Sequence, residues 1–466
     1  MNKFAPPATL CVFEDERYSN FFPLALYRPV FDLSIGTHSL RGRLADEIDP
    51  ESVALWCRPY LAAALAEDES RPGRRPASVN ELPAGEILFL NGRLLAYGAE
   101  LGELRAGLAE ESVLHKMGTI VAARLSGERA AAFKAYIDAL VSDKGVERVV
   151  REIKRLCITA RGDEKDPGEK ADDGSRTAAL SRWAADNRVT LAETSVRLIS
   201  HHWQFIEENR RSIVDDFQKD PFRGTSPDTE LFKGVELINE NDIVIGSDVE
   251  VRSGTVLDAS EGAIIIANNA RIEPNAIITG PCSIGEGSII RGGTKIGHGT
   301  SVGSRCRVGG EVEECILAPF SNKQHEGFMG HSYVSSWVNL GAGSCTSDLK
   351  NNYGQVKIWS AGRMRDTGRR FLGSIIADHA KVAIGSRLNT GTVIGFNANV
   401  VSSSFPPKFV PSFSWSIDPA FSRWELDEAI ETAKIMMDRR NVSFTEAHGA
   451  LFKTIYHLCA QGENTL

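Results

Sequence analysis

The segment between residues 320 and 357 concentrates the side chains that could do chemistry. It holds imidazoles, lysines, amides and tyrosines close together, at Lys323, His325, His331, Tyr333, Asn339, Asn352, Tyr353 and Lys357. An imidazole can accept a proton near neutral pH, because its unperturbed pKa is ~6.5. Lysine ammonium groups hold anions. The set therefore fits a site for an anionic small molecule at which a proton is moved.

This segment interrupts a repeat with a period of six residues. Aliphatic residues recur at Ile266, Ile272, Ile278, Ile284, Ile290, Ile296, Val302 and Val308. A small or slim residue follows each by four positions, at Ala270, Ala276, Cys282, Ser288, Thr294, Thr300, Cys306 and Val312. This period fits short strands joined by corners, three of which close a coil of about eighteen residues. The run predicts a left-handed parallel β-helix, an exception to the right-handed crossover rule.

The same spacing returns after the interruption. It continues at Ile376, Val382, Leu388, Ile394 and Val400, and an earlier set, Ile245, Val251 and Leu257, is offset by three residues. We therefore expect the β-helix over residues 236–404, with a break between about 314 and 375. A regular coil has no site of its own, so the break is where function would be inserted.

Length and charge restrict the class of protein. The chain has 466 residues, a length that indicates two or three domains. Its net charge is −8. The acidic balance gives no support for binding to nucleic acid or to an anionic membrane. We expect no membrane span and no signal peptide, because no run of eighteen apolar residues occurs. The eight cysteines form no CxxC pairs, which predicts a cytoplasmic protein with reduced thiols.

The regions that flank the repeat are predicted from local pattern. Residues 1–217 are expected to form a mixed α/β domain, with strands at 9–13, 86–90 and 119–124 and a helix that ends near Phe217. A charged stretch, about 161–178, predicts a disordered insertion, and residues 218–235 are expected to be a linker. Pro406, Pro407 and Pro411 should stop the coil, so residues 405–466 are expected to form two helices, roughly 423–440 and 444–460.

Several stretches resemble one family of bacterial enzymes. They are FPLALYRPVFDLSIG, LFLNGRLL, SNKQHEGFMGHSY, NLGAGS, SDLKNNYG and KFVPSFSW. In these stretches the chain resembles the GlmU-like family of UDP-N-acetylglucosamine pyrophosphorylase/glucosamine-1-phosphate N-acetyltransferases, in the alternative form found in some bacterial lineages. The resemblance implies a nucleotidyltransferase-like α/β domain, a hexapeptide-repeat acyltransferase domain and a short C-terminal helical extension. It also implies a homotrimer, since sites of this fold usually form between subunits.

The resemblance assigns roles within the interruption. His331 matches the general base, which would take a proton from a sugar ammonium before direct attack on the acetyl thioester. Asn339 matches a residue of the amino-sugar site, and the pair Asn352-Tyr353 matches an Asn-Tyr pair of the family. Tyr333 falls one position away from a family tyrosine. The spacing from His331 to Asn339 is one hexad shorter than in the standard enzyme, which predicts that the two lie on different faces.

The resemblance also indicates which cationic residues bind the phosphate groups of the substrates. Lys323 and Lys357 are expected to bind the sugar phosphate. The co-substrate acetyl-CoA would lie along residues 376–402, with Lys381 or Arg387 near its phosphates.

The N-terminal domain departs from the family where nucleotide and metal would bind. Residues 14–20 replace a glycine-rich loop, Asn91 and Arg93 occupy the turn of a magnesium-binding Asp, and Gln204 replaces a second Asp. Mg²⁺ needs hard oxygen ligands, so we assign no metal ligand and expect Mg²⁺ only if this domain catalyses. Glu14 and Asp15 could bind a metal from a new direction, or form a solvated turn.

Two interpretations of this domain stay open. In one, arginines and an amide bind a sugar phosphate or a nucleotide diphosphate without the usual metal ion, with Arg28, Asn91 and Arg93 as candidates beside Arg41 and Arg43. UTP or dTTP would then be the nucleotide. In the other, the domain has lost catalysis and binds, regulates or scaffolds.

The expected function is acetyl-CoA-dependent N-acetylation of glucosamine 1-phosphate or a related amino-sugar phosphate, with UDP-N-acetylglucosamine formation as a fused activity. The alternatives are nucleotidyl transfer alone, or a non-catalytic trimeric sensor or scaffold. A zinc lyase would need three converging imidazoles among His298, His325, His331 and His379. The surrounding amides and lysines fit an anionic sugar better than a zinc site.

Overall fold

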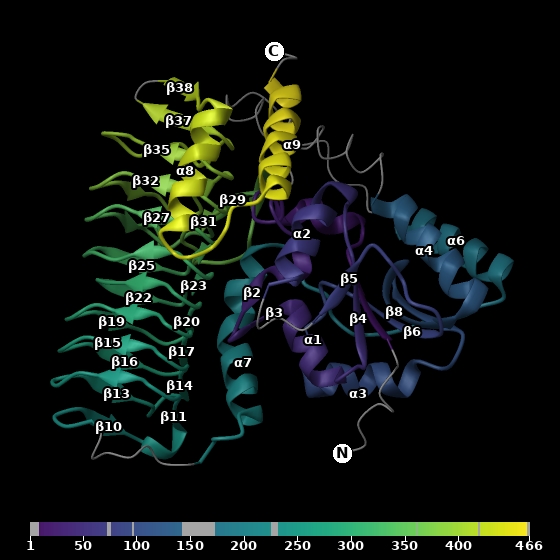
Figure 1. Cartoon of the computed structure of the whole chain (residues 1–466), viewed down its shortest axis with the longest axis horizontal. Coiled ribbons are helices and arrows are strands. Elements are labelled where there is room, and N and C mark those ends of the chain that lie inside the picture. The colour runs from purple at the N-terminus through teal and green to yellow at the C-terminus, as the bar shows by residue number, and fades with distance from the viewer. Residues whose placement is uncertain are drawn as a thin grey trace.

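The computed structural model describes residues 9–71, 76–95, 97–141, 173–224, 232–360, 362–417 and 420–463. These residues form a mixed α/β domain and a parallel β-helix that lie side by side, with two C-terminal helices beside the upper coils (Figure 1). Most of the expected insertion, 161–172, lies outside the described residues. Its last part, 173–178, is helical, because it begins α6.

The α/β domain is built on a seven-stranded sheet in the order β5-β4-β1-β6-β8-β7-β9. Its strands are β1 Thr9–Phe13, β4 Ser52–Trp56, β5 Ala77–Val79, β6 Glu86–Asn91, β7 Ser112–Lys116, β8 Thr119–Ser126 and β9 Thr190–Glu193. A small hairpin, β2 Ser34–Ile35 and β3 His38–Ser39, lies outside this sheet. β1 is parallel to both of its neighbours, β4 and β6.

Helices cover both faces of this sheet. They are α1 Leu40–Ile48, α2 Ala62–Glu69, α3 Gly98–Gly107, α4 Gly127–Val141, α6 Asp173–Asn187 and α7 Trp203–Lys219. Alternate residues of β1 supply the two cores, as period-two strands do. Leu10 packs with residues of α1 and α2, whereas Cys11 packs with residues of α4 and α6.

The β-helix consists of three parallel ladders. The first sheet holds β10 Glu236–Ile238, β13 Val256–Asp258, β16 Ile277–Thr279, β19 Lys295–Ile296, β22 Glu311–Glu313 and β25 Phe328–Gly330. The second sheet holds β11 Ile243–Ile245, β14 Ile264–Ile266, β17 Cys282–Ile284, β20 Thr300–Val302, β23 Ile316–Leu317, β26 Tyr333–Val334, β31 Ile375–Ile376, β34 Val393–Ile394 and β36 Phe409–Val410.

The third sheet ends in an antiparallel strand. It holds β12 Glu250–Val251, β15 Arg271–Ile272, β18 Ile289–Ile290, β21 Arg307–Val308, β24 Asn322–Lys323, β27 Asn339–Leu340, β32 Lys381–Val382, β35 Asn399–Val400, β37 Ser414–Ile417 and β38 Ala420–Arg423. Two further strands, β28 Cys345–Thr346 and β33 Arg387–Leu388, pair with each other. The chain ends in α8 Leu426–Asp438 and α9 Glu446–Glu463.

The predicted hexad pattern sets the register of these ladders. Ile284 pairs with Val302, one coil of 18 residues later, and both side chains are buried on the axis. The coil does not stop at residue 404 as expected, because β36 and β37 continue the ladders of β34 and β35. The prolines that follow residue 404 stand beside these short strands and therefore do not interrupt the ladder.

The second sheet is the face that contacts the α/β domain. Helix α7 packs against β17, β20 and β26 and runs between the two domains in Figure 1. Asn209 of α7 donates to the carbonyl of Gly299 at 2.8 Å and accepts from Ser301 at 3.1 Å. Higher up, Arg28 forms an ion pair with the fully buried Asp378. The two domains are thus joined by polar and apolar contacts along the coil.

None of the helices in the described ranges is long and apolar enough to cross a lipid bilayer.

Candidate active site

A long insertion leaves the coil between β28 and β31. It carries the antiparallel hairpin β29 Lys357–Ser360 and β30 Arg363–Asp366. Its two ends are held together, because Leu349 bridges to Phe371 and the amide of Leu372 donates to the carbonyl of Asp348 at 2.8 Å. The base of this insertion lies beside the corner that carries His331.

His331 is held by a carboxylate at this corner. It follows β25, and its Nδ1 lies 2.8 Å from Oδ2 of Asp348. The imidazole is 23% exposed and the Asp348 side chain 12% exposed. An Nδ1–H that donates to the carboxylate leaves Nε2 as the proton acceptor. This geometry suits a general base that faces a ligand.

Two further groups fix the imidazole. Phe371 stacks against it with ring centroids 5.1 Å apart, while the Phe371 side chain remains 48% exposed. Gly330 precedes His331, and a Cβ there would lie 2.3 Å from Oδ2 of Asp348. Only glycine lets the carboxylate approach so closely, which explains the Gly-His pair.

Sequence reasoning did not single out Asp348 or Phe371. Asp348 follows His331 by 17 residues, close to one coil, so the coil length itself was the available signal. No comparable signal exists for Phe371, because it reaches the site only through the return of the insertion.

Lys323 does not lie where a phosphate ligand should. It pairs with Val308 of the coil below and takes the place of an axial aliphatic residue, with 1% exposure. Its Nζ donates to the carbonyl of Gly309 at 3.2 Å and to that of His325. Burial lowers its pKa. The coil here is 15 residues long, so the strict hexad frame did not reveal the inward position.

Tyr333 and Asn339 point away from His331. Tyr333 is buried on the second sheet, and its hydroxyl accepts from the amide of Ser34 at 2.8 Å, so it contacts the α/β domain. Asn339 is exposed on the third sheet, beside Asn322. His331 stands between the first two sheets, which agrees with the expectation that it and Asn339 occupy different faces.

The insertion exposes the other predicted substrate residues. Asn352, Tyr353 and Lys357 follow Asp348 along the insertion, and all three are exposed, Tyr353 by 68%. Their side chains are accessible to a ligand.

The two cations suggested for acetyl-CoA differ. Lys381 is covered by the Trp424 ring and donates to the carbonyl of His379 at 2.7 Å; burial lowers its pKa to about 7. Arg387 is exposed.

The carboxylates at the end of β1 already accept hydrogen bonds from arginine, asparagine and backbone donors of the protein. Glu14 accepts from the amide of Val30 and from the guanidinium of Arg58, at 2.9 and 3.0 Å. Asp15 accepts from Nε of Arg93 at 3.0 Å and from Asn91 at 2.9 Å. Burial alone would raise the pKa of Asp15, but the Arg93 guanidinium holds it below its usual value. These residues do not fit Mg²⁺, since their lone pairs face arginines and amides.

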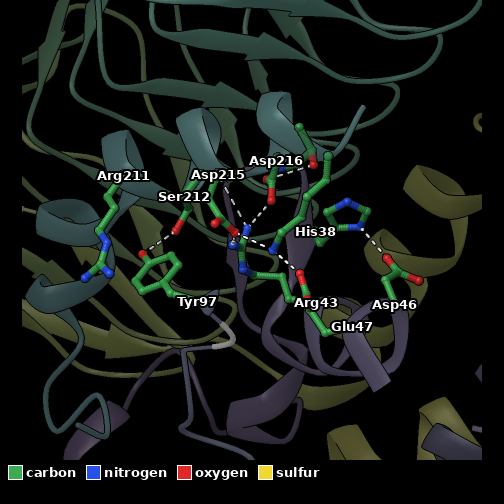
Figure 2. A network of polar contacts seen from close by, with 12 residues as sticks. His38, Arg43, Asp46, Glu47, Tyr97, Arg211, Ser212, Asp215 and Asp216 are labelled. Carbon is green, nitrogen blue, oxygen red and sulfur yellow. Dashed lines mark hydrogen bonds and ion pairs between the residues drawn. The ribbon is translucent and has the colours of Figure 1, made fainter. Parts of the chain in front are cut away.

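The other arginines predicted to bind a phosphate in the N-terminal domain also form ion pairs with carboxylates. Arg28 binds Asp378, and Arg41 binds Glu69 at 2.6 and 2.8 Å. Figure 2 shows Arg43 of α1 reaching Asp215 and Asp216 of α7. All three arginines line a cavity of about 1210 Å³ between the domains, and His331 is not in its wall. Their charges are compensated, so this cavity is not a strong anion site.

No cluster of three metal-ligating side chains occurs among the residues that the structure describes.

Comparison with known families gives two matches. Residues 10–220 match the family model described as sugar nucleotidyl transferase. Residues 263–298 match the one described as bacterial transferase hexapeptide. The predicted combination of a nucleotidyltransferase-like domain with a hexapeptide-repeat β-helix is thereby confirmed.

Curated relatives that match this chain are named as bifunctional proteins. A bifunctional sugar-1-phosphate nucleotidylyltransferase/acetyltransferase of Sulfurisphaera tokodaii is 30% identical over 48% of this chain and 50% of its own length. The bifunctional protein GlmU of Synechococcus elongatus is 26% identical over 40% of this chain and 42% of its own length. The chain thus matches about half or less of each relative's length.

Among solved structures, a UDP-N-acetylglucosamine acyltransferase of Arabidopsis shares 13% identity, with a TM-score of 0.22, over 45% of this chain and 78% of that one.

Proposed function

We propose that this chain, which combines a sugar nucleotidyl transferase family domain with bacterial transferase hexapeptide repeats, transfers an acetyl group from acetyl-CoA to the amino group of an amino-sugar phosphate. The observation that carries the proposal is the 2.8 Å contact between Nδ1 of His331 and Asp348 at the base of the insertion. Glucosamine 1-phosphate is the first substrate to test, because one curated relative is named a bifunctional sugar-1-phosphate nucleotidylyltransferase/acetyltransferase.

The reaction follows from the orientation of His331. Nε2 accepts a proton from the sugar ammonium, and the free amine attacks the thioester carbonyl carbon. The tetrahedral intermediate collapses and the C–S bond breaks. The nitrogen gives up its second proton to the departing thiolate, so CoA leaves as the thiol, and His331 releases the first proton to solvent. Asp348 stabilises the imidazolium that forms in between and fixes the tautomer. No acyl-enzyme is needed, since the amine attacks directly.

Substrate contacts are assigned to exposed groups on the insertion and on the later coils. Phe371 offers a half-exposed ring beside the imidazole, suited to the apolar face of a pyranose. Lys357 and Tyr353 lie on the insertion and are free to meet the phosphate and hydroxyl groups. Arg387 is the accessible cation for the phosphates of acetyl-CoA. Lys323 is left out of this set because it is buried on the axis.

A homotrimer is part of the proposal. The second sheet is occupied by the α/β domain, and Arg440 and Trp424 of the C-terminal segment contact Asn322 and Lys381 of the third sheet. The outer surface of the first sheet and the uncovered part of the third sheet remain for contact between subunits. Asn339 on the third sheet could then complete the site of a neighbouring subunit. Light scattering coupled to gel filtration measures the molar mass, and a monomer would contradict this part.

The experiment is a substrate panel with purified protein. Thiol release from acetyl-CoA is followed with glucosamine 1-phosphate, other hexosamine phosphates and unphosphorylated glucosamine, and mass spectrometry identifies the N-acetyl product. We expect release with at least one phosphorylated amino sugar and a much higher KM for glucosamine. Thiol release with none of them would contradict the proposal and favour a non-catalytic scaffold.

A further inference from the structure

The insertion that brings Asp348 and Phe371 to the His331 corner is also packed against the α/β domain. Its two ends hold the imidazole, through the Asp348 carboxylate and the stacked Phe371 ring, whereas the segment between them contacts helix α7. We infer that the α/β domain takes part in acetyl transfer as a positioning element: α7 holds the insertion, the insertion holds the base, and Glu207 of α7 is a positioning residue. This role rests on the proposed acetyl transfer and extends it to the other domain.

Strand β29 of the insertion is buried in a core that both domains share. Ile358 and Trp359 are 0% and 4% exposed, and they belong to the same apolar cluster as Phe205 of α7. Nε2 of the fully buried His202, directly before α7, lies 3.3 Å from the carbonyl oxygen of Trp359. Because protein interiors are close-packed, the strand cannot move without a matching movement of the α/β domain.

The returning arm of the insertion is held by an ion pair to the same helix. Nε and Nη2 of Arg369 lie 2.5 and 2.9 Å from the two carboxylate oxygens of Glu207, which is the bidentate geometry of strong pairs. The carbonyl of Arg369 accepts from the amide of Val356 at 2.7 Å, so the pair is tied to the rest of the insertion. The Arg369 and Glu207 side chains are 55% and 25% exposed, so either can be replaced without opening a core.

A continuous set of contacts leads from this ion pair to the base. Phe371, two residues beyond Arg369, stacks on the imidazole. The next residue, Leu372, is 2% exposed, and its amide donates to the carbonyl of Asp348 at 2.8 Å. Packed groups and hydrogen bonds of this kind carry coupling between distant sites. A shift of the arm would therefore move the ring and the carboxylate together, and a misplacement of about 1 Å can cost a rate ~100-fold.

Charge reversal of the ion pair tests the inference. Removal of one charge from an exposed pair is a weak perturbation, whereas Glu207→Lys places two cations side by side. We expect kcat for thiol release to fall about three- to tenfold, while the KM for the amino-sugar phosphate changes less than about twofold. The double variant Glu207→Lys/Arg369→Glu restores opposite charges and should recover most of the loss.

A second ion pair of α7 supplies the matched control. Arg210 pairs with Glu314 of the β-helix at 3.1 Å, and neither residue belongs to the insertion. Arg210→Met should therefore keep the kcat of the unmodified protein. The same loss of kcat in Arg210→Met as in Glu207→Lys would show a general weakening of the junction and would overturn the inference.

A double-mutant cycle distinguishes positioning from a general loss of structure. If α7 acts through the carboxylate, Glu207→Lys should lower kcat much less in an Asp348→Asn protein than in the unmodified one, since residues that act as a unit are not additive. Equal fold-changes in the two backgrounds would overturn the inference.

Hydrogen exchange gives a readout that needs no substrate. Exchange in peptides that contain Leu349 and Leu372 should be faster in Glu207→Lys and unchanged in Arg210→Met. If the unmodified protein releases thiol and Glu207→Lys changes neither kcat nor exchange, the positioning role alone is overturned. If the unmodified protein releases no thiol with any amino-sugar phosphate, the proposed function fails, whereas faster exchange in Glu207→Lys would still support the link between α7 and the His331 corner.

Discussion

At the scale of single residues, the account depends on the pairing of His331 with Asp348. A base on a loop is mobile unless its second nitrogen is held, and here a carboxylate, a stacked ring and a glycine combine to hold it. The carboxylate and the ring come from the two ends of the insertion, Asp348 and Phe371, and the glycine directly precedes the base. The insertion thus positions the base in addition to carrying exposed substrate groups.

Asp348→Asn tests the positioning role. The amide keeps the shape of the carboxylate but can no longer stabilise the imidazolium, so kcat should fall at least ~10-fold while the KM for the sugar changes little. A steady-state comparison with the unmodified protein measures both. An unchanged kcat would remove Asp348 from the mechanism.

Lys323→Met distinguishes a structural role of Lys323 on the axis of the β-helix from a role in binding the sugar phosphate. Because the ammonium is buried on the axis and bound to backbone carbonyls, an apolar side chain of similar length should be accommodated. Acetyl transfer is expected to stay within about twofold of the unmodified rate, and the unfolding free energy within ~1.5 kcal/mol. A large rise in the KM for the phosphorylated sugar would instead return Lys323 to the substrate site.

At the scale of elements, the hairpin β29–β30 links the two domains. Trp359 accepts through its carbonyl from Nε2 of the fully buried His202 at 3.3 Å, and Ser360 contacts Asn20. The same insertion begins at the base of the His331 site. Its docking therefore connects the candidate active site with the α/β domain.

Acid should loosen this docking. Burial lowers the pKa of His202 to about 3, and that of His201 to about 4, whereas the unfolded chain binds these protons near pH ~6.5. The unfolded state then holds more protons below pH ~6.5, so stability falls as the pH drops from there toward about 3. Hydrogen exchange of the hairpin amides at pH 6.5 and 4.5 measures the effect. His202→Leu should exchange with less acid dependence, and an equal dependence would contradict this cause.

The elements themselves were largely predictable from the hexads. The axial isoleucines fix both the strands and the register, since a slip would turn them outward. The irregular coils were not predictable, because a coil of 15 residues moves Lys323 onto the axis without breaking any visible pattern. The pairs Glu14–Arg58 and Asp15–Arg93 join residues distant in the sequence. Nothing local marks these arginines as partners of carboxylates, so Arg93 was predicted to bind a phosphate.

At the scale of the whole molecule, one face of the β-helix serves as the docking surface of the α/β domain. The contacts extend from Asn209 on α7 to the Arg28–Asp378 pair, and α9 also packs on α2. The domains therefore behave as one unit in this structure. This arrangement was not predicted, because the linker alone does not say which face it returns to.

Arg28→Met tests the strength of this junction. Asp378 is fully buried, and its remaining donors are Ser335 and the amide of Ser336. Loss of the guanidinium leaves an uncompensated buried charge, which should cost about 3–5 kcal/mol in the unfolding free energy. The double variant Arg28→Met/Asp378→Asn should recover part of this loss. Chemical denaturation measures both, and additive effects in the double variant would show that the pair is not coupled.

The rate of thiol release by His331→Ala tests the central claim most directly. It is measured with acetyl-CoA and the amino-sugar phosphate that gives the fastest thiol release in the substrate panel, and it is compared with the rate of the unmodified protein. Light scattering checks that the two proteins have the same molar mass. The account predicts a fall in kcat of ~10²–10⁴-fold, the range typical for loss of a general base, with the assembly preserved. Thiol release at the unmodified rate in His331→Ala would contradict the assignment of the active site.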